Sequence, residues 1–164
     1  MRVSPVGFAF DSVEEVLDEA KKSAEVTHNH PEGIEGAQAT ALAIFLARKG
    51  NDKNDIRNEI EGRFGYILDR TVDKIRAAYS YDISCIGSVP ESIIAFLNSK
   101  DYEDTIRNAI SLGGDSDTMA CIAGGIAQAY YEDIPEEIIE EVRKELSDEL
   151  LDIIDDFCST YNLG

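Results

Sequence analysis

The sequence has no tryptophan, little proline and few cysteines, and its basic residues are far outnumbered by acidic ones. Lys and Arg together number 15 against 33 Asp and Glu, which gives a formal net charge of −18. A nucleic-acid-binding protein needs a basic patch, and anionic membrane surfaces attract basic segments. The charge balance therefore argues against nucleic acid and against a membrane surface as partners.

Cysteines and long apolar runs are scarce as well. Cys85, Cys121 and Cys158 form no CxxC pair, and an odd number cannot all pair within one chain. We interpret them as reduced thiols of a cytoplasmic protein. The longest apolar run, Ala41–Ala47, is too short to span a bilayer, and Pro5 interrupts the start of the chain before a signal-peptide-like hydrophobic region forms.

Acidic residues concentrate near the C-terminus. The stretch Glu132–Asp156 holds twelve acids and two bases, which supplies −10 of the net charge, and we interpret it as a solvated helix face. Within it, Glu136–Glu140 and Glu145–Asp148 also resemble the EExxE…ExxD metal pattern of all-α nucleotide pyrophosphohydrolases. In that pattern the two clusters occupy facing helices, whereas only four residues separate them here, which disfavours this alternative.

Hydrophobic periodicity predicts helices along the whole chain and no strand. Two of them, at about 34–48 and 118–131, are apolar on most faces and rich in small residues, so we expect them to be buried on several sides. Capping boxes at Ser12 and Ser88 predict helix starts there, and residues 1–11 and 79–87 are predicted to be irregular. Further helices are expected at about 13–25, 55–64, 71–78, 89–98, 102–111, 135–146 and from 147 onward. The sequence thus predicts one all-α domain over residues 1–164, a compact multi-helix orthogonal bundle.

The stretch Ser111–Thr118 packs two carboxylates, hydroxyls and a glycine pair into one turn. Asp115 and Asp117 can converge on one cation there, and Thr118 can add a hydroxyl oxygen. Such oxygen ligands suit Mg²⁺, Ca²⁺ or Mn²⁺ rather than Zn²⁺. The alternative is that one aspartate simply caps the following helix. Three ligands cannot fill a six-coordinate shell, so other protein oxygens or waters must contribute, and we expect this chain to hold at most one ion.

A second polar cluster lies at Thr27–Gly33. Its histidines, His28 and His30, have no Cys or third His nearby in the sequence to complete a zinc site. Two interpretations stay open: a hydrogen-bond donor to a phosphate or ribose, and a solvated or capping histidine.

Taken together, these stretches resemble the ADP-ribosylglycohydrolase family, which includes the dinitrogenase-reductase-activating glycohydrolases. The matching segments occur in the same order and at similar spacing: Met1–Gly7, Thr27–Gly33 with the alanine-rich helix, Gly87–Glu91 with Ala95–Leu97, and Ile106–Thr118. The resemblance implies an all-α fold with two metal ions, usually magnesium, in a central cleft. It also implies hydrolysis of the bond between ADP-ribose and a protein side chain or small acceptor.

The resemblance further implies a set of site residues. The implied metal ligands are Asp115, Asp117 and Thr118. His28 is implied to lie at the ADP-ribose pocket, and the implied border of that pocket consists of Cys85, Ile86, Gly87 and Ser88.

Parts of the family pattern are missing. The sequence has no Thr-Asp-Asp run, which in relatives supplies further metal ligands, and no Gly-Asn-Gly phosphate loop, while Ile86 stands where relatives often have glutamine. We therefore expect the chain to match only the C-terminal part of the family and to be weakly active or inactive alone. We also expect it to form a homo-oligomer or to join a separate N-terminal piece. The alternative is a non-catalytic member that binds ADP-ribose or metal, or that has a structural role.

Overall fold

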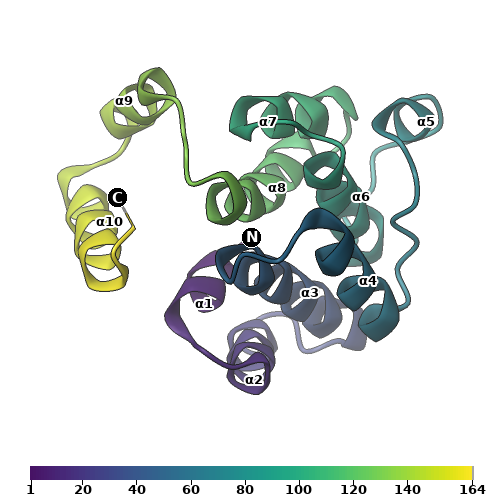
Figure 1. Ribbon diagram of the computed structural model, residues 1–164, viewed down its shortest axis with the longest axis horizontal. Coiled ribbons are helices and arrows are strands. Elements are labelled where there is room, and N and C mark those ends of the chain that lie inside the picture. The colour runs from purple at the N-terminus through teal and green to yellow at the C-terminus, as the bar shows by residue number, and fades with distance from the viewer. Residues whose placement is uncertain (164) are drawn as a thin grey trace.

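The computed structural model describes residues 1–163, and these residues form helices joined by short loops, with no strand among them (Figure 1). The helices are α1 Ser4–Ala9, α2 Val13–Glu25, α3 Pro31–Arg48, α4 Lys53–Phe64, α5 Val72–Arg76, α6 Cys85–Leu97, α7 Tyr102–Ser111, α8 Ser116–Tyr131, α9 Glu136–Glu145 and α10 Asp148–Tyr161. The all-α prediction is confirmed.

Helix α3 lies at the centre of the bundle formed by α1–α8. It packs against α1, α2, α4, α6 and α8. Its small residues allow these close approaches: a Cβ added at Gly36 would lie 3.0 Å from Cβ of Cys85 on α6. Helix α8 packs in the same way against α3, α6 and α7. Both helices that are apolar on most faces are therefore covered on several sides, as the sequence predicts.

The first irregular segment that the sequence predicts is in fact helical. Residues Ser4–Ala9 form α1, with proline in its first turn, where the missing N–H does no harm. The guanidinium of Arg48 donates to the carbonyl of Phe8 at 2.7 Å and also to that of Phe10. A tertiary contact from the end of α3 thus satisfies carbonyls at the end of α1.

The second correction concerns the start of α6, which begins at Cys85 rather than at Val89. Ser84 is the N-cap, and its hydroxyl oxygen accepts from the backbone N–H of Gly87 at 3.1 Å. The Ser88 hydroxyl instead donates back to the Ser84 carbonyl at 2.7 Å, within the helix. The capping box predicted at Ser88 is therefore wrong, and Pro90 lies inside the helix rather than in its first turn.

Lys53, the first residue of α4, ties three helices together. Its ammonium donates to the carbonyls of Phe96 at 2.9 Å, Leu97 at 3.4 Å and Ser99, which lie at and just beyond the end of α6. It also donates to the hydroxyl of Tyr131 at the end of α8, at 2.9 Å. A cation at a helix C-terminus supplies donors that the helix itself lacks.

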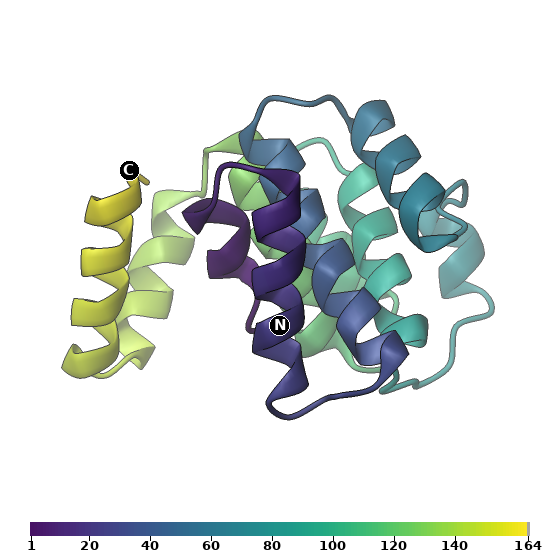
Figure 2. The same cartoon turned by 90° about the horizontal axis from the view of Figure 1, so that it is seen from below.

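Helices α9 and α10 lie side by side at one edge of the molecule, set apart from the bundle (Figures 1 and 2). No residue of either helix is buried, and the guanidinium of Arg143 pairs with both carboxylate oxygens of Asp155 at 2.8 Å. Phe157 and Leu163 pack against the core. Among the described residues, no helix combines the length and the hydropathy needed to cross a membrane.

Candidate functional site

A cavity of about 310 Å³ opens where the α2–α3 loop, α3, the start of α6 and the start of α8 meet. Five of the site residues predicted from the sequence line it, namely His28, Cys85, Ser88, Asp115 and Thr118. The α3 wall is made partly of Gly33, Gly36 and Ala37, whose small side chains leave the space open. The fold thus brings segments that are distant in the sequence to a single cavity.

Three predicted site residues do not line this cavity. Ile86 lies on α6 with 58% of its side chain exposed. Gly87 lines a second cavity on the other side of the α6 start. Asp117 is exposed at the first turn of α8.

The carboxylate of Asp115 does not cap α8. Asp115 is the N-cap residue, yet its side chain accepts no hydrogen bond from the first turn. Asp52 and Asp101, which are the N-caps of α4 and α7, both accept such bonds, at 2.8 and 2.7 Å. This contrast argues against the capping interpretation for Asp115 and leaves its carboxylate available to another partner.

Two left-handed glycines shape the turn before α8. Gly113 and Gly114 have φ angles of 76° and 66°, which other residues rarely adopt. The Asp115 carboxyl is the main cause of a lowered pKa of the Asp117 carboxyl. The nearby backbone N–H groups of Thr118 and Asp117 lower that pKa further. Convergence of the two carboxylates on one cation stays a prediction of the Asp-x-Asp spacing.

His28 is an exposed residue of the α2–α3 loop. Its Nδ1 atom lies 2.7 Å from the hydroxyl oxygen of Thr27, and its backbone N–H donates to the carbonyl of Ala24 at 2.8 Å. The backbone bond fixes the loop, and the contact with Thr27 occupies the Nδ1 atom of the ring. Nε2 is then the ring nitrogen left to meet a ligand in the cavity.

The predicted metal ligands do not form a complete coordination shell by themselves. Within residues 1–163, no group of three or more His, Cys, Asp or Glu side chains could hold a metal ion. Asp115, Asp117 and Thr118 present hard oxygen atoms, which fit a magnesium or manganese ion in kind. Further ligands would have to come from elsewhere.

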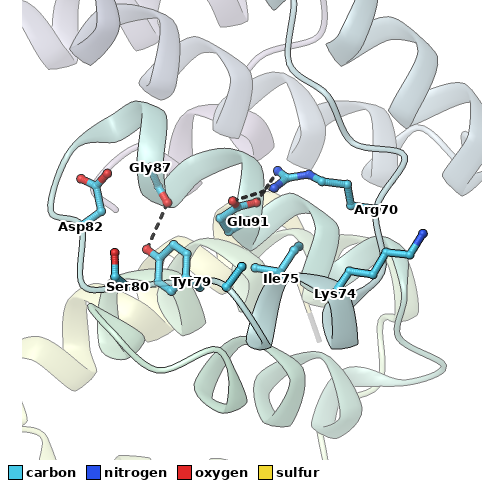
Figure 3. A pocket seen from close by; sticks show the side chains of 9 residues that line it. Arg70, Lys74, Ile75, Tyr79, Ser80, Asp82, Gly87 and Glu91 are labelled. Atoms are coloured by element: carbon cyan, nitrogen blue, oxygen red, sulfur yellow. Dashed lines mark hydrogen bonds and ion pairs between the residues drawn. The ribbon is translucent and has the colours of Figure 1, made fainter.

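The second cavity, of about 440 Å³, contains residues that the sequence reasoning missed (Figure 3). The guanidinium of Arg70 makes two hydrogen bonds to the buried carboxylate of Glu91, at 3.0 and 2.6 Å. Tyr79 donates its hydroxyl to the Gly87 carbonyl at 3.0 Å, and burial is the main cause of the raised Tyr79 pKa. A signal for Glu91 was present, because it is the only charged residue in the apolar run Val89–Leu97.

A family model described as ADP-ribosylglycohydrolase matches residues 1–163. The chain belongs to the ADP-ribosylglycohydrolase family. The resemblance inferred from the sequence segments is therefore confirmed. A solved "ADP-ribosylglycohydrolase-related protein complex" matches with a TM-score of 0.61 at 23% identity, over 77% of this chain and 46% of that one, which supports the fold.

Curated relatives of this glycohydrolase-family chain include ADP-ribosylhydrolase ARH3 of mouse, which is 30% identical over 183 aligned positions. An uncharacterized protein of Archaeoglobus fulgidus is 31% identical over 151 positions. Each alignment covers 83% of this chain and 50% of the relative. ADP-ribosylarginine hydrolase Tri1 of Pseudomonas putida is 28% identical over 122 positions, covering 69% of this chain and 32% of the relative. The chain spans about half the length of the curated relatives it matches.

Proposed function

We propose that this chain supplies one half of a metal-dependent site that hydrolyses the glycosidic bond between ADP-ribose and its acceptor. The observation that carries the proposal is the cavity shared by Asp115, Thr118 and His28. Membership of the ADP-ribosylglycohydrolase family supports the substrate class. The names of the mouse and Pseudomonas relatives point the same way.

In this proposal the start of α8 is the metal-binding element. Asp115 and Asp117 contribute carboxylate oxygens and Thr118 a hydroxyl to one magnesium or manganese ion. The uncapped carboxylate of Asp115 fits this role, since the backbone does not compete for it. A bound divalent cation would supply electrostatic stabilisation of the charge that develops at the scissile bond. A second ion in the complete site would need ligands from outside residues 1–163.

The α2–α3 loop and the start of α6 hold ADP-ribose in the same proposal. His28 donates from Nε2 to a phosphate or ribose oxygen. Cys85 and Ser88 line the cavity at the first turn of α6, where free backbone N–H groups and the helix dipole favour an anion. Ile86 and Gly87 lie on the outer side of that turn and shape it without lining the cavity.

We further propose that the chain works in the cytoplasm and in association with another chain, either a second copy or one that supplies the missing ligands. Helices α9 and α10 offer a surface for this association. Their exposed apolar residues are Ile139, Val142, Leu150, Ile153 and Ile154. An exposed apolar patch of this kind promotes association.

Isothermal titration of ADP-ribose, with and without Mg²⁺, tests the proposal. We expect binding that strengthens when Mg²⁺ is present, and loss of that Mg²⁺ dependence in Asp115→Asn. Adenosine monophosphate, which lacks the second phosphate and the distal ribose, serves as the control ligand and should show no Mg²⁺ dependence. ADP-ribose binding that ignores Mg²⁺ in the wild-type chain would favour a non-catalytic binding protein instead.

A hydrolysis assay tests two claims separately: that the chain belongs to a hydrolase site, and that its own metal site is incomplete. The purified chain alone should release little or no ADP-ribose from an ADP-ribosylated protein, because its metal site is incomplete. Efficient release by the chain alone, abolished in Asp117→Ala, would contradict the need for further ligands. No release by the chain combined with a relative's N-terminal half, despite metal-dependent ADP-ribose binding, would contradict the hydrolase assignment.

A further inference from the structure

The loop between α5 and α6 crosses both parts of the proposed site. Its first residue after the helical turn is Tyr79, and the loop ends at Ser84, the N-cap of α6. On one side the loop meets the start of α6, and on the other it meets the glycine turn before α8. The α5–α6 loop therefore contacts both the start of α6, which is proposed to hold ADP-ribose, and the glycine turn before α8, which is proposed to hold the metal.

The Tyr79 ring lies directly against the glycine turn. A Cβ added at Gly114 would be 2.7 Å from Cε1 and 3.5 Å from Cδ1 of Tyr79. Real Cβ atoms do not come that close to a ring carbon, so the ring occupies the space that a side chain at position 114 would need. Gly114 immediately precedes Asp115, which makes the ring a wall against which the ligand-bearing turn rests.

The hydroxyl of the same tyrosine reaches the other element. It donates to the carbonyl of Gly87 in the first turn of α6 at 3.0 Å (Figure 3). A second tether runs in parallel, since the guanidinium of Arg76 donates to the Ser111 hydroxyl oxygen at 2.7 and 3.3 Å. Ser111 ends α7, just ahead of the glycine pair. The α5 segment thus holds the glycine turn at two points.

We infer that Tyr79 is a positioning residue that fixes the glycine turn bearing Asp115 relative to the start of α6. The inference rests on the proposed function for the meaning of the two elements, but not for the contact itself. The ring sets where the turn lies, and the hydroxyl sets the distance from that turn to the α6 start. Tyr79 is not proposed to touch metal or substrate.

Hydrogen exchange of the metal-free chain tests, independently of any ligand, whether the Tyr79 side chain holds the glycine turn in place. We call this contact of Tyr79 with the turn the brace. The backbone N–H groups of Leu112, Gly113 and Met119 donate to carbonyls in and around the turn and report its order. Tyr79→Ala should make them exchange roughly tenfold faster. Tyr81→Ala is the matched control, because it removes the same phenol from the same loop at a side chain that is 70% exposed. Equal exchange in the two variants would overturn the inference.

Binding of Mn²⁺ alone then links the brace to the site. Tyr79→Ala should weaken Mn²⁺ binding about tenfold. Tyr79→Phe keeps the ring against the glycine turn but loses the hydrogen bond to the Gly87 carbonyl, so it should restore most of the binding but not all of it. Gly114→Ala should weaken binding in both backgrounds, because the φ of 66° at this position disfavours alanine. The loss should be smaller in Tyr79→Ala, where the ring no longer opposes the new Cβ. Additive effects, or failure of Tyr79→Phe to rescue, would overturn the inference. If the wild-type chain binds no Mn²⁺ at all, the proposed metal site fails, and the exchange result alone decides the brace.

Discussion

Asp115 at the start of α8 and His28 in the α2–α3 loop line the same cavity, although most of the bundle separates them along the chain. Each side chain has an unremarkable local setting, a helix start and a polar loop. The common role proposed for them rests on their meeting at one cavity.

Asp115→Asn should weaken Mn²⁺ binding by more than about tenfold while leaving the thermal midpoint nearly unchanged. The reason is that the Asp115 carboxylate accepts no capping bond from α8, so its loss does not remove a stabilising contact. Asp101→Ala should behave in the opposite way. It loses the bond from the Asp104 N–H, costs about 1 kcal/mol and leaves Mn²⁺ binding intact. Calorimetry and thermal melts of both variants check this, and a matched loss of stability in Asp115→Asn would contradict it.

Lys53→Met should lower the free energy of unfolding by roughly 2 kcal/mol at neutral pH. The substitution leaves the carbonyls of Phe96 and Ser99 and the hydroxyl of Tyr131 without their common donor. Urea unfolding measures the change. Lys74→Met, at an exposed lysine, should cost less than about 0.5 kcal/mol. Similar costs for the two lysines would show that the Lys53 contacts contribute little.

The same lysine predicts a pH dependence of stability. Burial lowers the pKa of Lys53 from 10.5 to about 8, partly opposed by the carboxylate of Asp104. Between these values the unfolded chain binds a proton that the folded chain has lost, so the free energy of unfolding should rise with pH from about 8. Burial raises the pKa of Tyr66 from 10.0 to about 12, which reverses the trend above about pH 10. Urea unfolding between these limits should show the rise in the wild-type chain, and an equal rise in Lys53→Met would contradict its assignment.

The sequence predicts most of this fold because most of its helices have their capping residues and hydrophobic periodicity within their own segment. Ser12 caps α2 as predicted, since its hydroxyl oxygen accepts from the Glu15 N–H, although the Glu15 carboxylate accepts from that hydroxyl rather than from the Ser12 backbone N–H. The missed helix α1 depends instead on Arg48, a residue far along the chain. The sequence pattern misplaces the start of α6, because Ser84 and Ser88 both precede a helical pattern and only the backbone shows that Ser84 is the cap.

The site divides in the same way. The Asp-x-Asp turn and the histidine loop are visible as residue types, and family resemblance assigns their roles. The contact of Tyr79 with Gly114 cannot be predicted from the sequence, because it joins two segments that are distant along the chain and share no sequence pattern. Two statements stay predictions: that residues 1–164 act as one domain, and that the site residues bind metal and ADP-ribose as assigned.

Arg70→Met should destabilise the chain by about 2 kcal/mol, because it leaves the Glu91 carboxylate buried without its partner. The double variant Arg70→Met with Glu91→Gln should recover part of that loss, since the buried charge is then removed as well. A double-mutant cycle by urea unfolding measures the coupling. Additive losses would indicate that the pair does not interact in solution.

Self-association should depend on α9 and α10. Ile153→Ser with Ile154→Ser should shift the chain toward the monomer in sedimentation velocity, because both side chains are exposed apolar groups on α10. Ile67→Ser is the control, at a 72% exposed isoleucine in a loop of the bundle, and should change nothing. A wild-type chain that is monomeric at tens of micromolar would contradict self-association and leave only a different partner.

The central claim is that the start of α8 carries metal ligands facing a cavity that also contains His28. A crystal of the chain grown with Mn²⁺ tests it most directly through the anomalous signal of the metal. The account predicts a peak within about 2–2.5 Å of oxygens of Asp115 and Thr118, at the edge of that cavity. No peak at saturating Mn²⁺, or a peak held only by the acidic residues of α9 and α10, would contradict it.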